Sequence, residues 1–151
     1  MQYKDKPLAE LTLRKYEKPF RLNGRSLVRK LCLSLGLLQP ADGRDVIVDV
    51  FLALLTSQKP LTSSEIEQAA VQIRKKNELP ILGLTPSNVR RQLRRLKNLF
   101  FVEKIGKTYR ITEQEKLQDV FTERIEKFYL PAIVLRIKEY CQAVQNERCK
   151  E

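Results

Sequence analysis

The sequence predicts a mainly α-helical protein with one small β-hairpin. Along most of the 151 residues, apolar side chains recur at intervals of three and four, which is the spacing of an amphipathic helix. The stretch 100–112 differs, because two short runs rich in aromatic and β-branched residues flank Gly106 there, as in two strands joined by a turn. With 42% hydrophobic and 31% charged residues, the composition is that of a globular chain.

Residues 1–44 are predicted to form a helical extension before the main domain. Proline and glycine separate two helices, one from Leu8 to Lys18 and one from Ser26 to Leu38. These helices could serve a protein partner, and a ligand pocket is possible between them and the core. Cys32 is interpreted as a buried apolar residue. The second helix should pack on the following domain through Leu27, Val28, Leu31, Cys32, Leu35 and Leu38.

The predicted main domain spans residues 45–112 and begins with two helices. The first runs from Val46 to about Gln58, and Asp45 is expected to cap it. The second starts at a capping box, in which Thr62 and Glu65 stand three residues apart, and ends at about residue 76. Both helices are therefore expected from local signals alone.

A third helix follows a linker, residues 77–84. This linker is longer than the turn of roughly three to four residues usual between two such helices, and we expect it to form an extra turn or a short strand. Thr85 as N-cap and Pro86 at the first helical position mark the start of the third helix. The cations Arg74 to Lys76 before the linker suit either the carboxyl end of a helix or contact with DNA.

The third helix, about residues 86–98, is apolar on one side and basic on the rest. Val89, Leu93 and Leu96 form a stripe that can pack on the domain. Residues 85–110 hold eight Lys and Arg against one acid, so they carry +7 of the chain's formal charge of +11. Residues 46–84, which precede this basic block, and residues 111–151, which follow it, are nearly neutral. This distribution predicts a polyanionic partner.

Residues 113–151 are predicted to form long helices interrupted at Pro131. Their apolar stripe is long for a small domain to bury, so we expect it to pair with a second copy in a homodimer. The alternative is that the stripe packs back on the chain's own N-terminal helices and leaves a monomer. The expected dimerisation residues are Leu117, Phe121, Ile125, Phe128, Ile133, Ile137, Tyr140 and Val144.

The order of a helix, a capped helix, the basic helix TPSNVRRQLRRL and the hairpin FFVEKIGKTYRIT resembles a winged helix-turn-helix domain. A hairpin followed by a long helix is most similar to the PadR, MarR and ArsR types of prokaryotic transcription regulators. The likeness covers about residues 45–112. It implies a dimer that places a recognition helix in the major groove of double-stranded DNA and a wing against the backbone or the minor groove.

The resemblance assigns DNA contact to the basic helix and to the wing at about residues 103–110. Arginine can grip phosphate, or the edge of guanine, through two hydrogen bonds. Residues near the amino end of a recognition helix usually reach the bases, which favours Asn88 and Arg91 for specificity. The expected DNA-binding residues are Ser87, Asn88, Arg90, Arg91, Arg94, Arg95 and Lys97 in the helix and Lys104, Lys107 and Arg110 in the wing.

Simpler roles exist for these residues. The arginines could form a solvated helix face, although no acid lies between Thr85 and Phe101 to pair with them. The wing cations could only keep the hairpin soluble, and Phe100, Phe101 and Tyr109 could stack on single-stranded bases instead of packing in the core. Two functions stay open: a sequence-specific regulator, and a module of a replication, segregation or chromatin assembly that binds DNA non-specifically or an acidic protein partner.

Catalysis, cofactors and membrane insertion are not expected. The chain has no histidine, no P-loop and no dinucleotide-binding glycine pattern. Its three cysteines fit neither a disulfide framework nor a zinc site. The longest apolar run is far shorter than the roughly 20 residues of a membrane span, and the amino terminus lacks a secretion signal. A cytoplasmic, nucleoid-associated protein is the resulting expectation.

Overall fold

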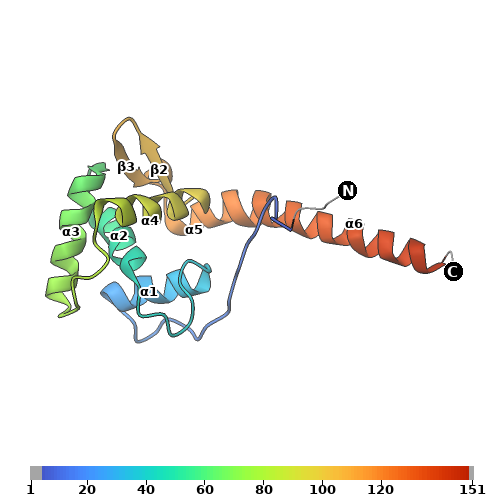
Figure 1. Cartoon of the computed structure of the whole chain (residues 1–151), viewed down its shortest axis with the longest axis horizontal. Coiled ribbons are helices and arrows are strands. Elements are labelled where there is room, and N and C mark those ends of the chain that lie inside the picture. The colour runs from blue at the N-terminus through green and yellow to red at the C-terminus, as the bar shows by residue number, and fades with distance from the viewer. Residues whose placement is uncertain (1–4, 150–151) are drawn as a thin grey trace.

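The computed structural model describes residues 5–149 and is mainly helical, with a small antiparallel sheet. Helices α1 to α4 and the sheet gather at one end, and a long C-terminal helix extends away from them (Figure 1). Within residues 5–149, no helix combines the length and the apolar content needed to cross a membrane.

The prediction of a helix from Leu8 to Lys18 is wrong. Residues 5–23 contain no helix and form an extended strap, which runs from beside the C-terminal helix to the start of α1 (Gly24–Ser34) (Figure 1). The Arg14 N–H donates to the Ser34 carbonyl at 2.9 Å, so this part of the strap bonds to the end of α1. The Arg14 guanidinium also donates to the carbonyls of Leu33 and Leu38. These long-range bonds replace the helical ones.

Helix α1 ends four residues before the predicted Leu38, because Gly36 adopts a φ of +71° and turns the chain. The Leu37 N–H then donates to the Cys32 carbonyl at 2.9 Å. A Cβ atom on Gly36 would lie 2.6 Å from the Cβ of Thr12 and 2.8 Å from its carbonyl oxygen. The strap therefore packs directly on this glycine.

We expect Gly36→Ala to lower the free energy of unfolding by at least about 1–2 kcal/mol, because the added methyl group meets both a left-handed backbone and the strap. Gly106→Ala is the matched control, since its φ is +61° but nothing lies within 4 Å of the added atom. Urea denaturation of the full chain measures both. Equal losses would show that the strap does not rest on Gly36 in solution.

Helices α2 (Val46–Thr56), α3 (Ser63–Lys76) and α4 (Pro86–Asn98) confirm the three predicted helices to within about two residues. The capping box of α3 is present, because Thr62 and Glu65 each accept the other's backbone N–H. Thr85 caps α4, with Pro86 at its first position. The linker, residues 77–84, was expected to form an extra turn or a short strand. It has a turn at residues 77–78 and no strand.

The predicted hairpin is present as β2 (Val102–Ile105) and β3 (Thr108–Ile111), each one residue shorter than the strands expected at 100–104 and 108–112. A strand that was not predicted, β1 (Leu61–Thr62), pairs antiparallel with β3 and gives the order β1-β3-β2. Two residues carry too weak a pattern to be recognised in the sequence. The added strand anchors the hairpin to the start of α3.

The C-terminal helix is continuous where an interruption at Pro131 was predicted. After the 3₁₀ turn η1 (Thr112–Gln114), α5 (Leu117–Val120) leads into the π-helical segment η2 (Phe121–Tyr129) and then α6 (Leu130–Cys149). The change from π- to α-helical hydrogen bonding falls next to Pro131, which lacks a backbone donor. The helix accommodates the proline in this way without breaking.

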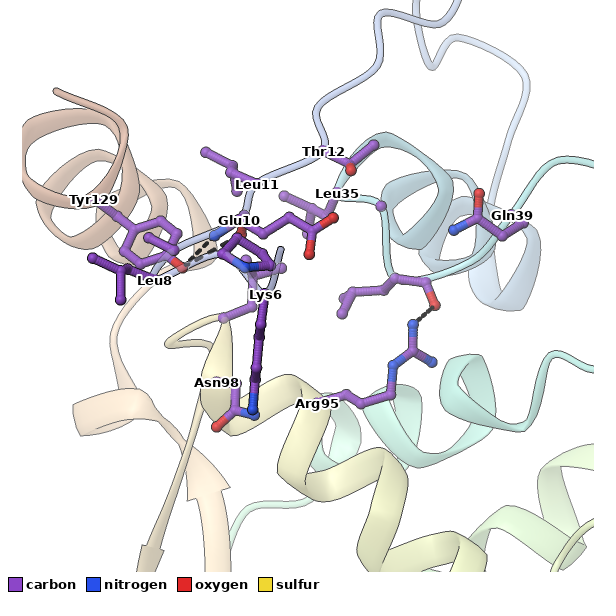
Figure 2. Close-up of a pocket in the computed structure, with 15 residues that line it drawn as sticks. Lys6, Leu8, Glu10, Leu11, Thr12, Leu35, Gln39, Arg95, Asn98 and Tyr129 are labelled. Atoms are coloured by element: carbon purple, nitrogen blue, oxygen red, sulfur yellow. Dashed lines mark hydrogen bonds between the residues drawn. The ribbon is translucent and has the colours of Figure 1, made fainter. Parts of the chain in front are cut away.

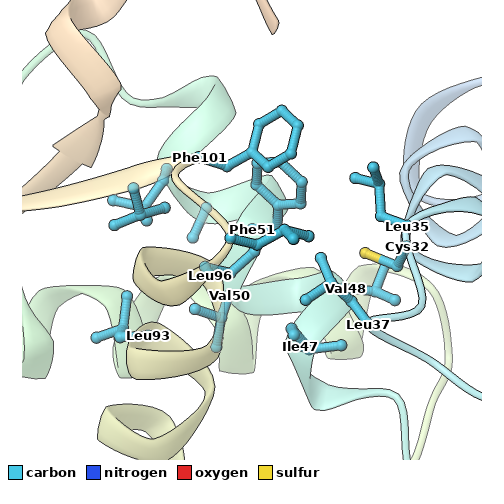
Figure 3. Packing of buried hydrophobic residues seen from close by; sticks show 14 of the residues in the cluster. Cys32, Leu35, Leu37, Ile47, Val48, Val50, Phe51, Leu93, Leu96 and Phe101 are labelled. Carbon is cyan, nitrogen blue, oxygen red and sulfur yellow. The ribbon is translucent and has the colours of Figure 1, made fainter. Parts of the chain in front are cut away.

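One hydrophobic core joins α1, α2, α4 and the first turns of the C-terminal helix (Figure 3). It includes Cys32, which is fully buried as predicted. Burial raises the pKa of this thiol to about 12, so it stays protonated and behaves as an apolar group. Because α1 contributes to the same core as α2 and α4, it is packed against the main domain as expected, except that Leu27 is 40% exposed.

Two carboxylates of α2 form a buried ion cluster with arginines of two other helices. Asp49, which is 0% exposed, accepts from Arg25 Nε at 2.8 Å and from Arg74 Nη1 at 2.7 Å. Asp45 contacts the same two guanidinium groups at 3.0 and 3.1 Å. Asp45 stands at the N-cap of α2 as predicted, but its side chain makes no capping bond because the arginines occupy it. Arg74 is buried in this cluster rather than placed for DNA contact.

Candidate nucleic-acid interface

Helix α4 is held by its apolar stripe and presents its basic side to solvent. Val89, Leu93 and Leu96 are each 0% exposed, so the orientation of the helix is set by the core. With about 3.6 residues per turn, the side opposite this stripe is then determined. It carries exposed residues from both ends of the helix, namely Ser87, Arg90, Arg91, Arg94, Lys97 and Asn98.

Four cations of this surface have no acidic partner. Arg90, Arg91, Arg94 and Lys97 take part in none of the ion pairs formed among residues 5–149. Arg90 and Arg94 are four residues apart, and Arg94 and Lys97 are three apart, so like charges repel on neighbouring turns. We name these four residues the basic face of α4.

Two further residues predicted to bind DNA are engaged inside the protein. The Asn88 amide donates to the Gly83 carbonyl at 2.6 Å and accepts from Gln92 at 3.0 Å. The Arg95 guanidinium donates to the Leu37 carbonyl at 2.6 Å (Figure 2). Burial, and next the charge of Arg91, lower the pKa of Arg95. These side chains fasten α4 to neighbouring segments, and their contact with DNA stays a prediction.

The β2–β3 hairpin presents two exposed lysines. Lys104 and Lys107 are both exposed, and the Lys104 ammonium lies 5.6 Å from the centroid of the Tyr109 ring. Arg110, also predicted to bind DNA, pairs instead with Glu103 at 2.6 Å. Burial alone would raise the pKa of Glu103, but hydrogen bonds from the Glu113 N–H and from Arg110 lower it overall. This pair therefore stays ionised near neutral pH.

The aromatic residues of this region pack within the protein. Phe101 is 1% exposed, and Phe100 stacks edge-on against Tyr129 with ring centroids 5.3 Å apart. Tyr109 packs partly against the core. Base stacking by Phe101 would require its removal from the core, so the aromatic packing favours a role in stability.

The predicted dimerisation stripe is divided by the fold. Ile125 is 0% exposed, so the prediction that it faces a second copy is wrong, whereas Leu117 and Phe121 are partly buried against the core and their place in a dimer stays a prediction. Their helix lies close enough to the domain to be buried by it. The distal part differs, because Phe128, Ile137, Tyr140 and Val144 are between 57% and 70% exposed, and Ile133 is half-buried.

No protein-family model, curated protein or solved structure gives a significant match to this chain. Among the residues that the structure describes, no group of three or more His, Cys, Asp or Glu is placed to hold a metal ion. The exposed surfaces described above are therefore the candidates for a functional site.

Proposed function

We propose that the protein binds double-stranded DNA as a winged-helix protein, with α4 as the recognition helix and the β2–β3 hairpin as the wing. The observation that carries the proposal is the basic face of α4, whose four cations are exposed and have no acidic partner within the described part of the chain. The wing adds Lys104 and Lys107. Both side chains are exposed, and both residues follow the end of α4 closely in the sequence. Together they offer six cations to a polyanion.

A phosphate backbone explains why these charges can be kept on one surface. Each phosphate neutralised by a cation releases counterions, which favours association most at low salt. The slope of log K against log salt concentration is about −0.9 per phosphate contacted, so six contacts correspond to a slope of about −5. An α-helix also fits the major groove, where arginine can contact both phosphate and guanine.

The direct test is a fluorescence-anisotropy titration of the full chain on random duplex DNA across a salt series. We expect a dissociation constant of roughly 10⁻⁴–10⁻⁶ M at physiological salt, tightening steeply as salt is lowered. Absence of binding at low salt, or binding that salt does not affect, would refute the proposal. A single-stranded oligonucleotide of the same composition is the control, and it should bind more weakly.

Within this proposal we favour a sequence-specific transcription regulator of the cytoplasm and nucleoid. Arg91 supports it, because it lies exposed in the first half of α4, where side chains of recognition helices reach base edges. The alternative is a replication, segregation or chromatin module without sequence preference. The test is to select the DNA sequence that the protein prefers and to compare its affinity with that of random duplex. Binding at least about 10³-fold tighter to the selected sequence indicates a regulator, and equal affinities indicate the alternative.

We further propose that α6 pairs with α6 of a second copy. Leu130, Ile137 and Val144 follow one another at intervals of seven, and Ile133 and Tyr140 lie between them, which is the a and d pattern of a coiled coil. Helix α6 fully buries none of its described side chains and extends away from the domain (Figure 1). Since most helical stability in proteins comes from packing of an amphipathic face, a partner helix would stabilise it.

Sedimentation equilibrium tests this pairing, and we expect a dimer at micromolar concentration. Ile137→Asp should yield a monomer, because it places a charge in the apolar seam. Leu135→Asp is the matched control: Leu135 is 61% exposed but lies outside the a and d positions, so this variant should remain dimeric. A wild-type monomer at every concentration would contradict the pairing.

A further inference from the structure

A cavity of about 770 Å³ lies beside α4, on the flank away from the core-facing stripe. Its walls come from α1, the turn before α2, the end of α3, the linker and α4. This places it between the N-terminal region and the main domain. Five arginines line it, namely Arg29, Arg44, Arg74, Arg91 and Arg95.

The charges around this cavity do not cancel. Three guanidinium groups, those of Arg25, Arg29 and Arg74, pair with the two carboxylates of the buried ion cluster, and part of this cluster, Arg29, Arg74 and Asp45, lines the cavity. On its walls, Arg44, Arg91 and Arg95 add three positive charges, and Asp42 adds one negative charge. Six guanidinium groups against three carboxylates leave a net charge of +3. In a recess partly shielded from water, this excess attracts anions more strongly than the same charges would on an open surface.

Several of these guanidinium groups keep unused donors. Arg95 donates only to neutral acceptors, the Leu37 carbonyl and Gln92 Oε1, and forms none of the ion pairs among residues 5–149. Arg74 is 5% exposed and donates through Nε and Nη1, whereas Nη2 takes part in none of the hydrogen bonds within the described chain. Arg91 and Arg44 are exposed at the cavity wall. Donors thus converge on one space from three segments.

We propose that this cavity binds a small multivalent anion that carries phosphate or carboxylate groups, held chiefly by Arg44, Arg91 and Arg95. Guanidinium groups match both kinds of anion, because two parallel N–H bonds fit two oxygens of one group. An anion with two charged groups can bridge the turn before α2 and the wall of α4, which lie on different sides of the cavity. The volume is within the usual range for small-molecule sites.

The site also has a consequence for regulation, which rests on the proposed DNA binding. Arg91 belongs both to the basic face of α4 and to the cavity wall. An anion that engages Arg91 removes one cation from the DNA surface and offsets its charge. Anion binding in the cavity should then weaken DNA binding, and DNA should weaken anion binding by the same factor.

The test uses inorganic pyrophosphate and citrate as separate probes, titrated calorimetrically into the full chain without DNA, with ionic strength held constant by sodium chloride. We expect saturable binding of one anion per chain for at least one probe, and the tighter probe identifies phosphate or carboxylate as the preferred group. Heats that sodium chloride reproduces would overturn the proposal, because they would show only general screening.

Two variants of equal charge locate the site. Arg44→Gln with Arg91→Gln removes two cavity donors, and Arg90→Gln with Lys97→Gln removes two cations of α4 that do not line the cavity. All four side chains are exposed, so both variants should fold, which circular dichroism checks. We expect affinity to fall at least about tenfold in the first and to change little in the second. Equal losses in both variants would overturn a localised site.

Saturating duplex DNA then separates two sources of the anion. If duplex displaces the probe in proportion to its own binding, the cavity takes a backbone phosphate in the complex. If the probe is retained, the ligand is a free small anion and the proposed coupling to DNA binding is refuted, while either result supports the anion site itself. The titration without DNA measures anion binding alone. It therefore tests the anion site even if the protein does not bind DNA.

Discussion

Asp49→Asn is expected to lower the free energy of unfolding by about 3–5 kcal/mol, the largest effect of any single substitution proposed here. The carboxylate is 0% exposed and accepts three hydrogen bonds, two from Arg25 and one from Arg74. The amide keeps the shape but removes the charge, so two buried guanidinium groups would have to share Asp45. Chemical denaturation of the purified chain measures the loss.

Glu17→Gln provides the matched control for Asp49→Asn. Glu17 pairs with Lys30 at 2.6 Å, but its side chain is 64% exposed, so water screens the pair. Removing the same charge there should change stability far less than Asp49→Asn does. If both substitutions cost equally little, the buried cluster does not hold α1, α2 and α3 together.

The same cluster predicts how stability depends on pH. Burial would raise the pKa of Asp45, but hydrogen bonds from Arg25 and Arg74 lower it below the ordinary value of 3.8. Because the folded pKa is the lower one, the carboxylate's contribution is complete above the unfolded value and is lost as the pH falls through the folded value. Acid below about pH 4 should therefore destabilise the wild type through this group.

Replacement of Arg90, Arg91, Arg94 and Lys97 by alanine is expected to weaken binding to random duplex DNA by at least about 100-fold at low salt. If all four contact phosphate, the salt slope should fall by about 3–4 units, which separates lost contacts from a general change in affinity. The four side chains are exposed, so the variant should keep its fold. Asn88 and Arg95 are left in place because they hold α4 to its neighbours.

The control for this variant removes four exposed cations elsewhere. Lys15, Lys18 and Arg21 lie on the strap and Lys138 lies on α6, all exposed. Their replacement by alanine changes the net charge equally, so only long-range attraction should fall. Similar losses in the two variants would show that DNA responds to total charge rather than to α4.

Local signals were enough to predict the central helices and the hairpin. The capping box at Thr62, the cap at Thr85 and the glycine at position 106 act within a few residues, so their geometry does not depend on the rest of the chain. The strap shows the limit of such signals. Its helical spacing is overridden by bonds from Arg14 to the end of α1, some 20 residues away.

The candidate site divides in the same way. The sequence shows that cations cluster on α4 and the wing, because their spacing along a helix or hairpin is local. It does not show that Arg95 bonds to Leu37, since 58 residues separate them. The buried ion cluster had one signal in the sequence, an aspartate within the apolar run of α2, because a buried charge requires a partner.

By itself, then, the sequence determined the helices, the hairpin and the concentration of positive charge, because periodicity, caps and charge spacing act over short distances. Only the tertiary structure decided which charges remain free, where the five-arginine cavity forms, and how the C-terminal stripe is used. Ile125 and Ile137 belong to one apolar pattern, yet the first is 0% and the second 57% exposed. The physical reason is position: the domain reaches the first and ends before the second.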